Sequence, residues 1–117
     1  MAFDGNCHCG AVAFTVDADL PDTAVSCNCS HCRQKGLLLS FHPASSFTLH
    51  RGEEMLATYT FNTHKIRHRF CRNCGAQPFA EGDNPEDGIA MRAINLRAVP
   101  AADLNALTLK KVDGASH

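Results

Sequence analysis

Seven cysteines are the residues of this sequence best able to do chemistry, and they fall into three short groups. The first group is Cys7-His8-Cys9, the last is Cys71-Arg72-Asn73-Cys74, and the middle one spans Cys27-Asn28-Cys29-Ser30-His31-Cys32. A tetrahedral zinc ion with Zn–S bonds near 2.3 Å holds its sulfurs about 3.8 Å apart, which a C-x-x-C turn supplies. The three groups therefore have the spacing of metal ligands.

Two of the groups supply four thiols, which we name the four-cysteine cluster: Cys7, Cys9, Cys71 and Cys74. A C-x-C pair needs a bend, because residues i and i+2 of a strand lie about 6.5 Å apart. Glycines flank the first pair and Gly75 follows the second, so we expect bends that leave backbone amides free to donate to thiolates. We predict a closed structural zinc site that links an early strand to a late one. Buried, inert cysteines are the alternative.

The middle group supplies the three-cysteine cluster: Cys27, Cys29 and Cys32. Three protein ligands leave one coordination position open, which is the pattern of catalytic rather than structural zinc. Three thiolates on Zn²⁺ carry a net charge of −1, so the site is a weak generator of hydroxide and is suited to an incoming thiol.

Two alternatives stay open for the three-cysteine cluster. A histidine could complete a second structural site, and His42, His64 or His68 would reach it more easily than His31, which adjoins a cysteine ligand. Two of the three thiols could instead form a redox disulfide.

The composition is that of a small globular domain without a strongly charged surface. The 117 residues are 44% hydrophobic and 20% charged, with a formal net charge of −1, which excludes a disordered chain. No global field attracts nucleic acid or an anionic membrane, so we expect neither as a partner. The N-terminus has no signal-peptide pattern, and the run Leu37–Leu39 is too short to span a bilayer. We expect a cytoplasmic protein, where clustered cysteines more often bind metal than form disulfides.

Alternating and β-branched segments dominate the chain, so the predicted fold is mainly β, with six to eight strands and short helical turns. We expect helix only after Ser30 and near Ala101–Leu107. No repeat or linker divides the sequence, which predicts a single domain over residues 1–117. The predicted strands lie within 12–16, 37–41, 47–49, 56–61, 65–70 and 89–96.

Taken together, the three cysteine motifs resemble the glutathione-dependent formaldehyde-activating enzyme family. The resemblance rests on Gly5–Phe14 (GNCHCGAVAF), Cys27–Arg33 (CNCSHCR) and Arg69–Gly75 (RFCRNCG). It extends to Pro43–Phe47 and to Asn95, and it spans residues 5 to about 97.

The resemblance implies a β-tent fold of two packed antiparallel sheets. It also implies two zinc ions per chain, a structural one on Cys7, Cys9, Cys71 and Cys74 and a catalytic one on Cys27, Cys29 and Cys32. The family's reference activity condenses formaldehyde with glutathione and is classed as a carbon–sulfur lyase. We therefore expect a small-molecule substrate, an adduct of glutathione or a similar thiol with formaldehyde or another small aldehyde, with glutathione as possible co-substrate.

Cations near the open cluster are candidates for binding the carboxylates of such a thiol. Arg33 follows the last cysteine of the cluster directly and is our candidate for glutathione binding. Lys65, Arg67 and Arg69 share one face of a predicted strand, which indicates either a solvated face or a second carboxylate-binding strip. We assign no general acid or base among the histidines.

Three other functions compete with the enzyme. A non-catalytic zinc-binding interaction module would need only the four-cysteine cluster. A redox sensor would use the three-cysteine cluster. Nucleic-acid binding ranks last, since the chain has no tryptophan and a single tyrosine. The sequence does not predict an oligomeric state.

Overall fold

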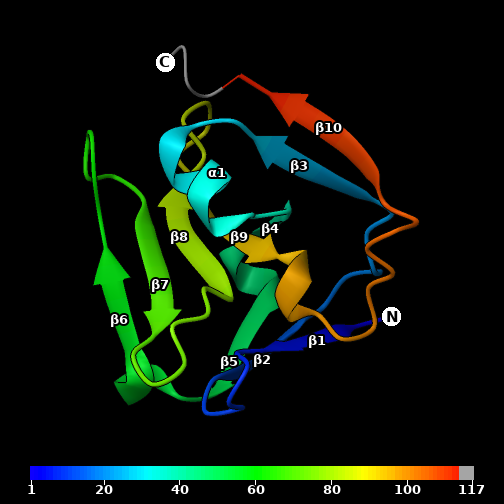
Figure 1. Ribbon diagram of the computed structural model, residues 1–117, viewed down its shortest axis with the longest axis vertical. Coiled ribbons are helices and arrows are strands. Elements are labelled where there is room, and N and C mark those ends of the chain that lie inside the picture. Colours follow the sequence, from blue (N-terminus) through cyan, green and yellow to red (C-terminus); the bar gives the residue numbers. More distant parts are fainter. Residues whose placement is uncertain (114–117) are drawn as a thin grey trace.

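Two β-sheets form the framework of this computed structural model, which describes residues 1–113 (Figure 1). The three-stranded sheet has the order β1-β2-β5 and the seven-stranded sheet the order β10-β3-β4-β9-β8-β7-β6. The prediction of a mainly β fold with two sheets and few short helices is therefore confirmed.

The small sheet consists of β1 (Phe3–Asn6), β2 (Ala13–Val16) and β5 (Phe47–Arg51). The large sheet consists of β10 (Thr108–Val112), β3 (Thr23–Cys27), β4 (Leu39–Pro43), β9 (Ala90–Asn95), β8 (Phe79–Asp83), β7 (Arg67–Cys71) and β6 (Leu56–Tyr59). The helical segments are α1 (Ser30–Lys35) and the 3₁₀ turns η1 (Ala44–Ser46), η2 (Glu53–Met55) and η3 (Leu96–Ala98).

The strand predictions hold for six strands and miss four. The predicted segments correspond to β2, β4, β5, β6, β7 and β9, with ends that differ by at most two residues. No strand was predicted at β1, β3, β8 or β10; β1 and β8 contain glycine and acidic residues, and β10 contains two lysines. Pairing is antiparallel, as expected, except that β10 lies parallel to β3.

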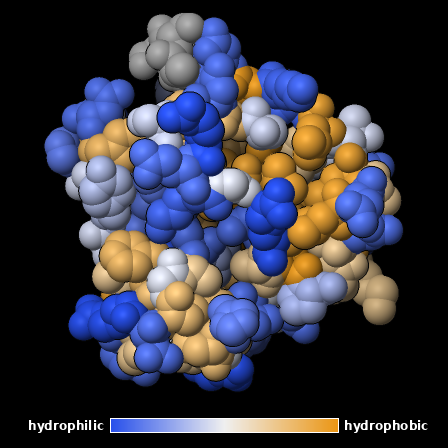
Figure 2. Space-filling view, viewed as in Figure 1, coloured by the Kyte–Doolittle hydropathy of each residue, from blue (hydrophilic) through white to orange (hydrophobic). Residues whose placement is uncertain are grey.

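The helix expected near Ala101–Leu107 is absent from the structure, and that prediction was wrong. The side chain of Asp103 accepts a hydrogen bond from the backbone N–H of Asn105 at 3.1 Å, an Asx turn that competes with helix. Leu104 and Leu107 pack against the core while the chain turns toward β10. In Figure 2 hydrophobic residues gather on this side of the molecule, on the right of the view.

Three phenylalanines from the two sheets form the centre of the core. Phe14 of β2 stacks on Phe47 of β5 with ring centroids 5.2 Å apart, and both contact Phe79 of β8 at 5.9 and 4.7 Å. Opposite Phe14 stands Gly5, where an added Cβ would lie 2.2 Å from the ring. Glycine at this position therefore lets the ring reach the other sheet.

No helix among the described residues is long and apolar enough to cross a membrane.

Candidate metal centres

Two similar loops present the four-cysteine cluster, one after β1 and one after β7. In the first, the backbone N–H of Cys7 donates to Val12 at 3.1 Å, and in the second the N–H of Cys71 donates to Ala76 at 2.9 Å. Each loop closes over five residues and turns at a glycine with positive φ, Gly10 at 81° and Gly75 at 79°. The bends expected from these glycines are present, and they fold each cysteine pair inward.

The structure brings the four sulfurs of this cluster within 4.8 Å of one another. The Cys7 and Cys9 sulfurs lie 3.6 Å apart, and those of Cys9 and Cys71 lie 3.7 Å apart. These separations fit the roughly 3.8 Å between thiolates on tetrahedral zinc. Cys7 and Cys71 are fully buried, whereas Cys9 is exposed and Cys74 is partly buried, so this donor set reaches the surface on one side and would join the small sheet to the large one.

Backbone amides stabilise thiolates in the four-cysteine cluster. Burial opposes ionisation of Cys74, yet the N–H groups of Ala76 and Cys9 lower its pKa to about 6. The N–H of Val12 donates to the Cys7 sulfur at 3.3 Å, but burial still raises the pKa of Cys7 to about 11. A cation would therefore be needed to ionise all four thiols together, as zinc does.

The three-cysteine cluster lies where β3 runs into α1. Its sulfurs also lie within 4.8 Å of one another, and all three residues are only partly buried. Cys29 is the N-cap of α1, and its sulfur accepts a hydrogen bond from the N–H of Cys32 at 3.4 Å. The sulfur of Cys27 accepts from the N–H of Cys29 at 3.5 Å. The expected helical turn after Ser30 is thus confirmed, and it folds the C-x-C-x-x-C motif into one site.

The thiols of this cluster differ in acidity. Burial opposes ionisation of Cys29, but the N–H and thiol of Cys32 and the thiol of Cys27 lower its pKa overall. Burial raises the pKa of Cys32 to about 12, with the neighbouring Cys29 and Cys27 adding to the effect. The pKa of Cys29 is therefore below that of Cys32, and a soft cation would be needed to deprotonate the whole set.

The candidate histidines lie elsewhere than on this cluster. Among the described residues, no histidine nitrogen lies within 4.8 Å of all three sulfurs of this cluster. His42 pairs with the Ser40 hydroxyl and His64 with that of Thr60, each at 2.8 Å. His31 packs on His68 with ring centroids 4.1 Å apart. Within residues 1–113, nothing supplies a fourth protein ligand to the three sulfurs.

A cationic groove of about 560 Å³ opens beside the three-cysteine cluster. Cys27 and Cys32 line it together with Arg33, the cation that directly follows the cluster in the sequence. Arg97 and Lys111 also line it and were not predicted, because only the folded chain brings η3 and β10 next to α1. Asp113 lines its edge and pairs with Asn28 at 2.9 Å.

Two residues of the second predicted cationic strip, Arg67 and Arg69, are engaged with carboxylates. Glu81 of β8 lies 3.4 Å from Arg67, 2.8 Å from Arg69 and 3.3 Å from Arg92. Arg69 also lies 3.3 Å from Glu53. Burial raises the pKa of the Glu81 carboxyl, but Arg69 and the two other arginines outweigh it and lower that pKa overall. Arg67 and Arg69 thus belong to a salt-bridge network on β7–β9, and its acidic centre, Glu81, was not predicted from the sequence.

Comparison with known proteins finds a matching family model and a solved structure of similar fold. The family model described as glutathione-dependent formaldehyde-activating enzyme matches residues 2–104. A crystal structure of a Rhodobacter sphaeroides protein, solved as a structural genomics target, is similar in fold, with a TM-score of 0.76 and 28% sequence identity. The match covers 92% of this chain and 99% of that one.

Proposed function

Because this chain belongs to the glutathione-dependent formaldehyde-activating enzyme family, we propose that it makes and breaks carbon–sulfur bonds as a zinc-dependent lyase. Its substrates would be adducts of glutathione or a similar thiol with formaldehyde or another small aldehyde. The observation that supports this most directly is the three-cysteine cluster, which is partly exposed, has no fourth ligand among the described residues and borders a cationic groove.

The two cysteine clusters would have different roles. The four-cysteine cluster would hold a structural zinc ion that joins the sheets of a single domain with the family's β-tent fold. The three-cysteine cluster would hold the second ion. A zinc ion bound there would lower the pKa of a substrate thiol and hold its sulfur beside an aldehyde. A reducing cytoplasmic setting would keep all seven thiols available for these roles.

The protein's own contribution is to bind and orient the thiol. Arg33, Arg97 and Lys111 line the groove and would attract the carboxylates of a peptide thiol. In the forward step, the thiol sulfur bonds to the aldehyde carbon, the carbonyl π electrons move to oxygen, and the proton lost by the thiol ends on that oxygen. The reverse step breaks the same carbon–sulfur bond and restores the thiol and the aldehyde.

Cobalt substitution tests whether the three-cysteine cluster accepts an external thiol. Glutathione at millimolar concentration should change the thiolate charge-transfer band of the cobalt protein. S-methylglutathione, which has the same carboxylates but no free thiol, should leave the band unchanged. No response to glutathione, or an equal response to both compounds, would contradict the proposal. One metal ion per chain would instead favour the non-catalytic interaction module.

A further inference from the structure

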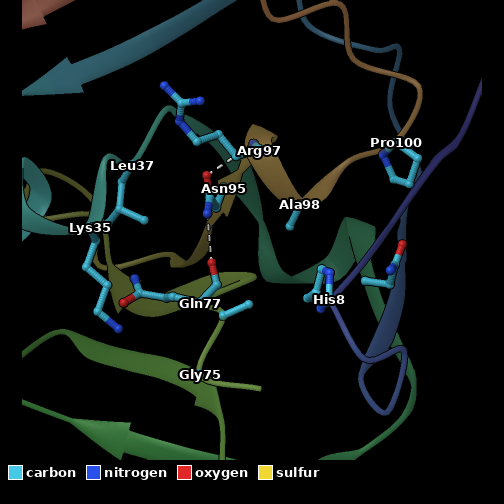
Figure 3. Close-up of a pocket in the computed structure, with 11 residues that line it drawn as sticks. His8, Lys35, Leu37, Gly75, Gln77, Asn95, Arg97, Ala98 and Pro100 are labelled. Atoms are coloured by element: carbon cyan, nitrogen blue, oxygen red, sulfur yellow. Dashed lines mark hydrogen bonds between the residues drawn. The ribbon is translucent and has the colours of Figure 1, made fainter. Parts of the chain in front are cut away.

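A second cavity lies between the two cysteine clusters, and the proposed function makes no use of it. It has a volume of about 350 Å³ and lies between the loop after Cys74, the end of α1 and η3 (Figure 3). Leu37 and Arg97 line both this cavity and the cationic groove, so the two sites adjoin each other. Its other polar and charged residues include Gln77, Asn95, Lys35 and His8.

Gln77 is the most unusual residue in the wall of this cavity. It is only 4% exposed, yet neither its side-chain oxygen nor its nitrogen has a hydrogen-bond partner among the described residues. A buried amide without partners costs free energy, and native structures contain few such groups. A bound ligand that offers both a donor and an acceptor would satisfy it.

The backbone around Gln77 is held in place, so the missing partners do not reflect a loose segment. The side-chain nitrogen of Asn95 donates to the carbonyl of Gln77 at 2.9 Å, and the side-chain oxygen of Asn95 accepts from the N–H of Arg97 at 3.1 Å. Asn95 is itself nearly buried, at 9% exposure. It therefore links the Gln77 loop to η3, and only the Gln77 amide is left for another molecule.

The charge around the cavity is positive. Lys35 and Arg97 line it, and none of its lining residues is acidic. Figure 3 shows the Gln77 amide on the same side of the cavity as Lys35, with Arg97 near the top of the view and His8 on the opposite side. Arg97 donates through Nε to the carbonyl of Gly36 at 2.7 Å, which holds it at the rim. A carboxylate near Lys35 would lie beside the unpaired amide.

We propose that this cavity binds small carboxylates that carry a neighbouring amide, such as the C-terminal end of a short peptide. The ligand's amide would exchange hydrogen bonds with the Gln77 side chain, and its carboxylate would pair with Lys35. Lys35 is exposed and its ammonium lies 5.1 Å from the centroid of the Phe70 ring, so its charge is not already paired with a carboxylate in any ion pair of the described residues. This site is independent of any metal, and its existence does not rest on the proposed lyase activity.

Nuclear magnetic resonance of the full-length ¹⁵N-labelled protein tests the site directly. The chain has only two glutamines, Gln34 and Gln77, so their side-chain NH₂ signals are easily assigned. N-acetylglycine should shift the Gln77 signals in a saturable way while the Gln34 signals stay in place. Acetate and N-methylacetamide, which each lack one of the two groups, should bind more weakly. The absence of saturable shifts at Gln77 would overturn the proposal.

Matched variants separate binding from packing. Gln77→Leu removes the unpaired amide and should raise the dissociation constant about tenfold without destabilising the free protein. Lys35→Met should also weaken binding, whereas Lys110→Met, on the exposed strand β10, should not. Unchanged affinity in Gln77→Leu would refute the assignment.

Cys29→Ser distinguishes this proposal from the lyase proposal. That variant disrupts the three-cysteine cluster but should keep the N-acetylglycine shifts at Gln77. Loss of the response to glutathione, with the N-acetylglycine shifts at Gln77 intact, would support a site that needs no metal. Loss of the shifts in Cys29→Ser would show that the cavity is not an independent site and would refute the inference.

Discussion

Replacing Arg33 with alanine should weaken the binding of glutathione, whereas the same change at Arg67 should not. Arg33 lines the groove beside Cys27 and Cys32, where a peptide thiol would place its carboxylates. Arg67 lies on β7 with its guanidinium 3.4 Å from the carboxylate of Glu81. The two arginines are both exposed and therefore form a matched pair that differs in location and partner.

The expected effect of Arg33→Ala is modest because the side chain is exposed. Ion pairs between exposed groups contribute about 0.2–1 kcal/mol, which corresponds to at most about a fivefold change in dissociation constant. Arg97 and Lys111 remain in the groove, so we expect about two- to fivefold. The difference should shrink with added salt, since the Debye length falls to about 8 Å at 0.15 M.

Calorimetric titration of the zinc-loaded protein with glutathione, at low and at high salt, measures this effect. Arg33→Ala should show the weaker, less salt-dependent binding, and Arg67→Ala should match the wild type. An unchanged constant in Arg33→Ala would remove this arginine from the site. An equal loss in both variants would show that only net charge matters and would refute the reasoning from the groove.

Three further predictions concern stability and metal. Gly52→Ala should lower the free energy of unfolding, measured by urea denaturation, by about 2 kcal/mol or more. The φ of Gly52 is 98°, and a new Cβ there would lie 2.4 Å from the carbonyl oxygen of Ala11. The control Gly88→Ala also has a positive φ but open space around the new Cβ, so it should cost less. Equal costs would contradict this. Glu81→Gln should destabilise the protein by about 1–2 kcal/mol at pH 7. Because the pKa of Glu81 is lowered in the folded protein, its contribution is present above pH 4.5 and is lost as the pH falls further, so the wild type and the variant should converge in acid. A difference that persists there would contradict the prediction. Finally, a chelator with a coloured zinc complex should remove zinc in two phases, fast from the cluster of three thiols and slowly from the cluster of four, because a fourth protein ligand leaves no open coordination position for the chelator; a single phase would contradict the difference in ligand number.

Local patterns were sufficient to predict the cysteine geometry. Gly10 and Gly75 follow their cysteine pairs directly, and each takes the positive φ that turns its loop. The helix after Ser30 is likewise set by nearby residues, since Cys29 caps it and Gly36 ends it with φ of 68°. These features depend on contacts within a few residues, and sequence spacing records such contacts.

Features that depend on distant partners could not be predicted. The parallel strand β10 is exposed along its whole length and forms only because β3 offers it an edge. Lys111 reaches the groove for the same reason. Near Ala101–Leu107 the apolar spacing resembled a helix, but the side chain of Asp103 and the core position of Leu104 outweighed it. Gln77 gave no signal either, because a missing partner is visible only after folding.

Zinc content measured by mass spectrometry under native conditions, for the wild type beside Cys29→Ser and Cys71→Ser, tests most directly whether the seven cysteines divide into four and three. The wild type should carry two zinc ions per chain. Cys29→Ser should carry one and stay folded, because its cluster is partly exposed, whereas Cys71→Ser should destabilise the domain, because that thiol is fully buried where the two sheets meet. Equal zinc loss and equal stability in the two variants would contradict the division.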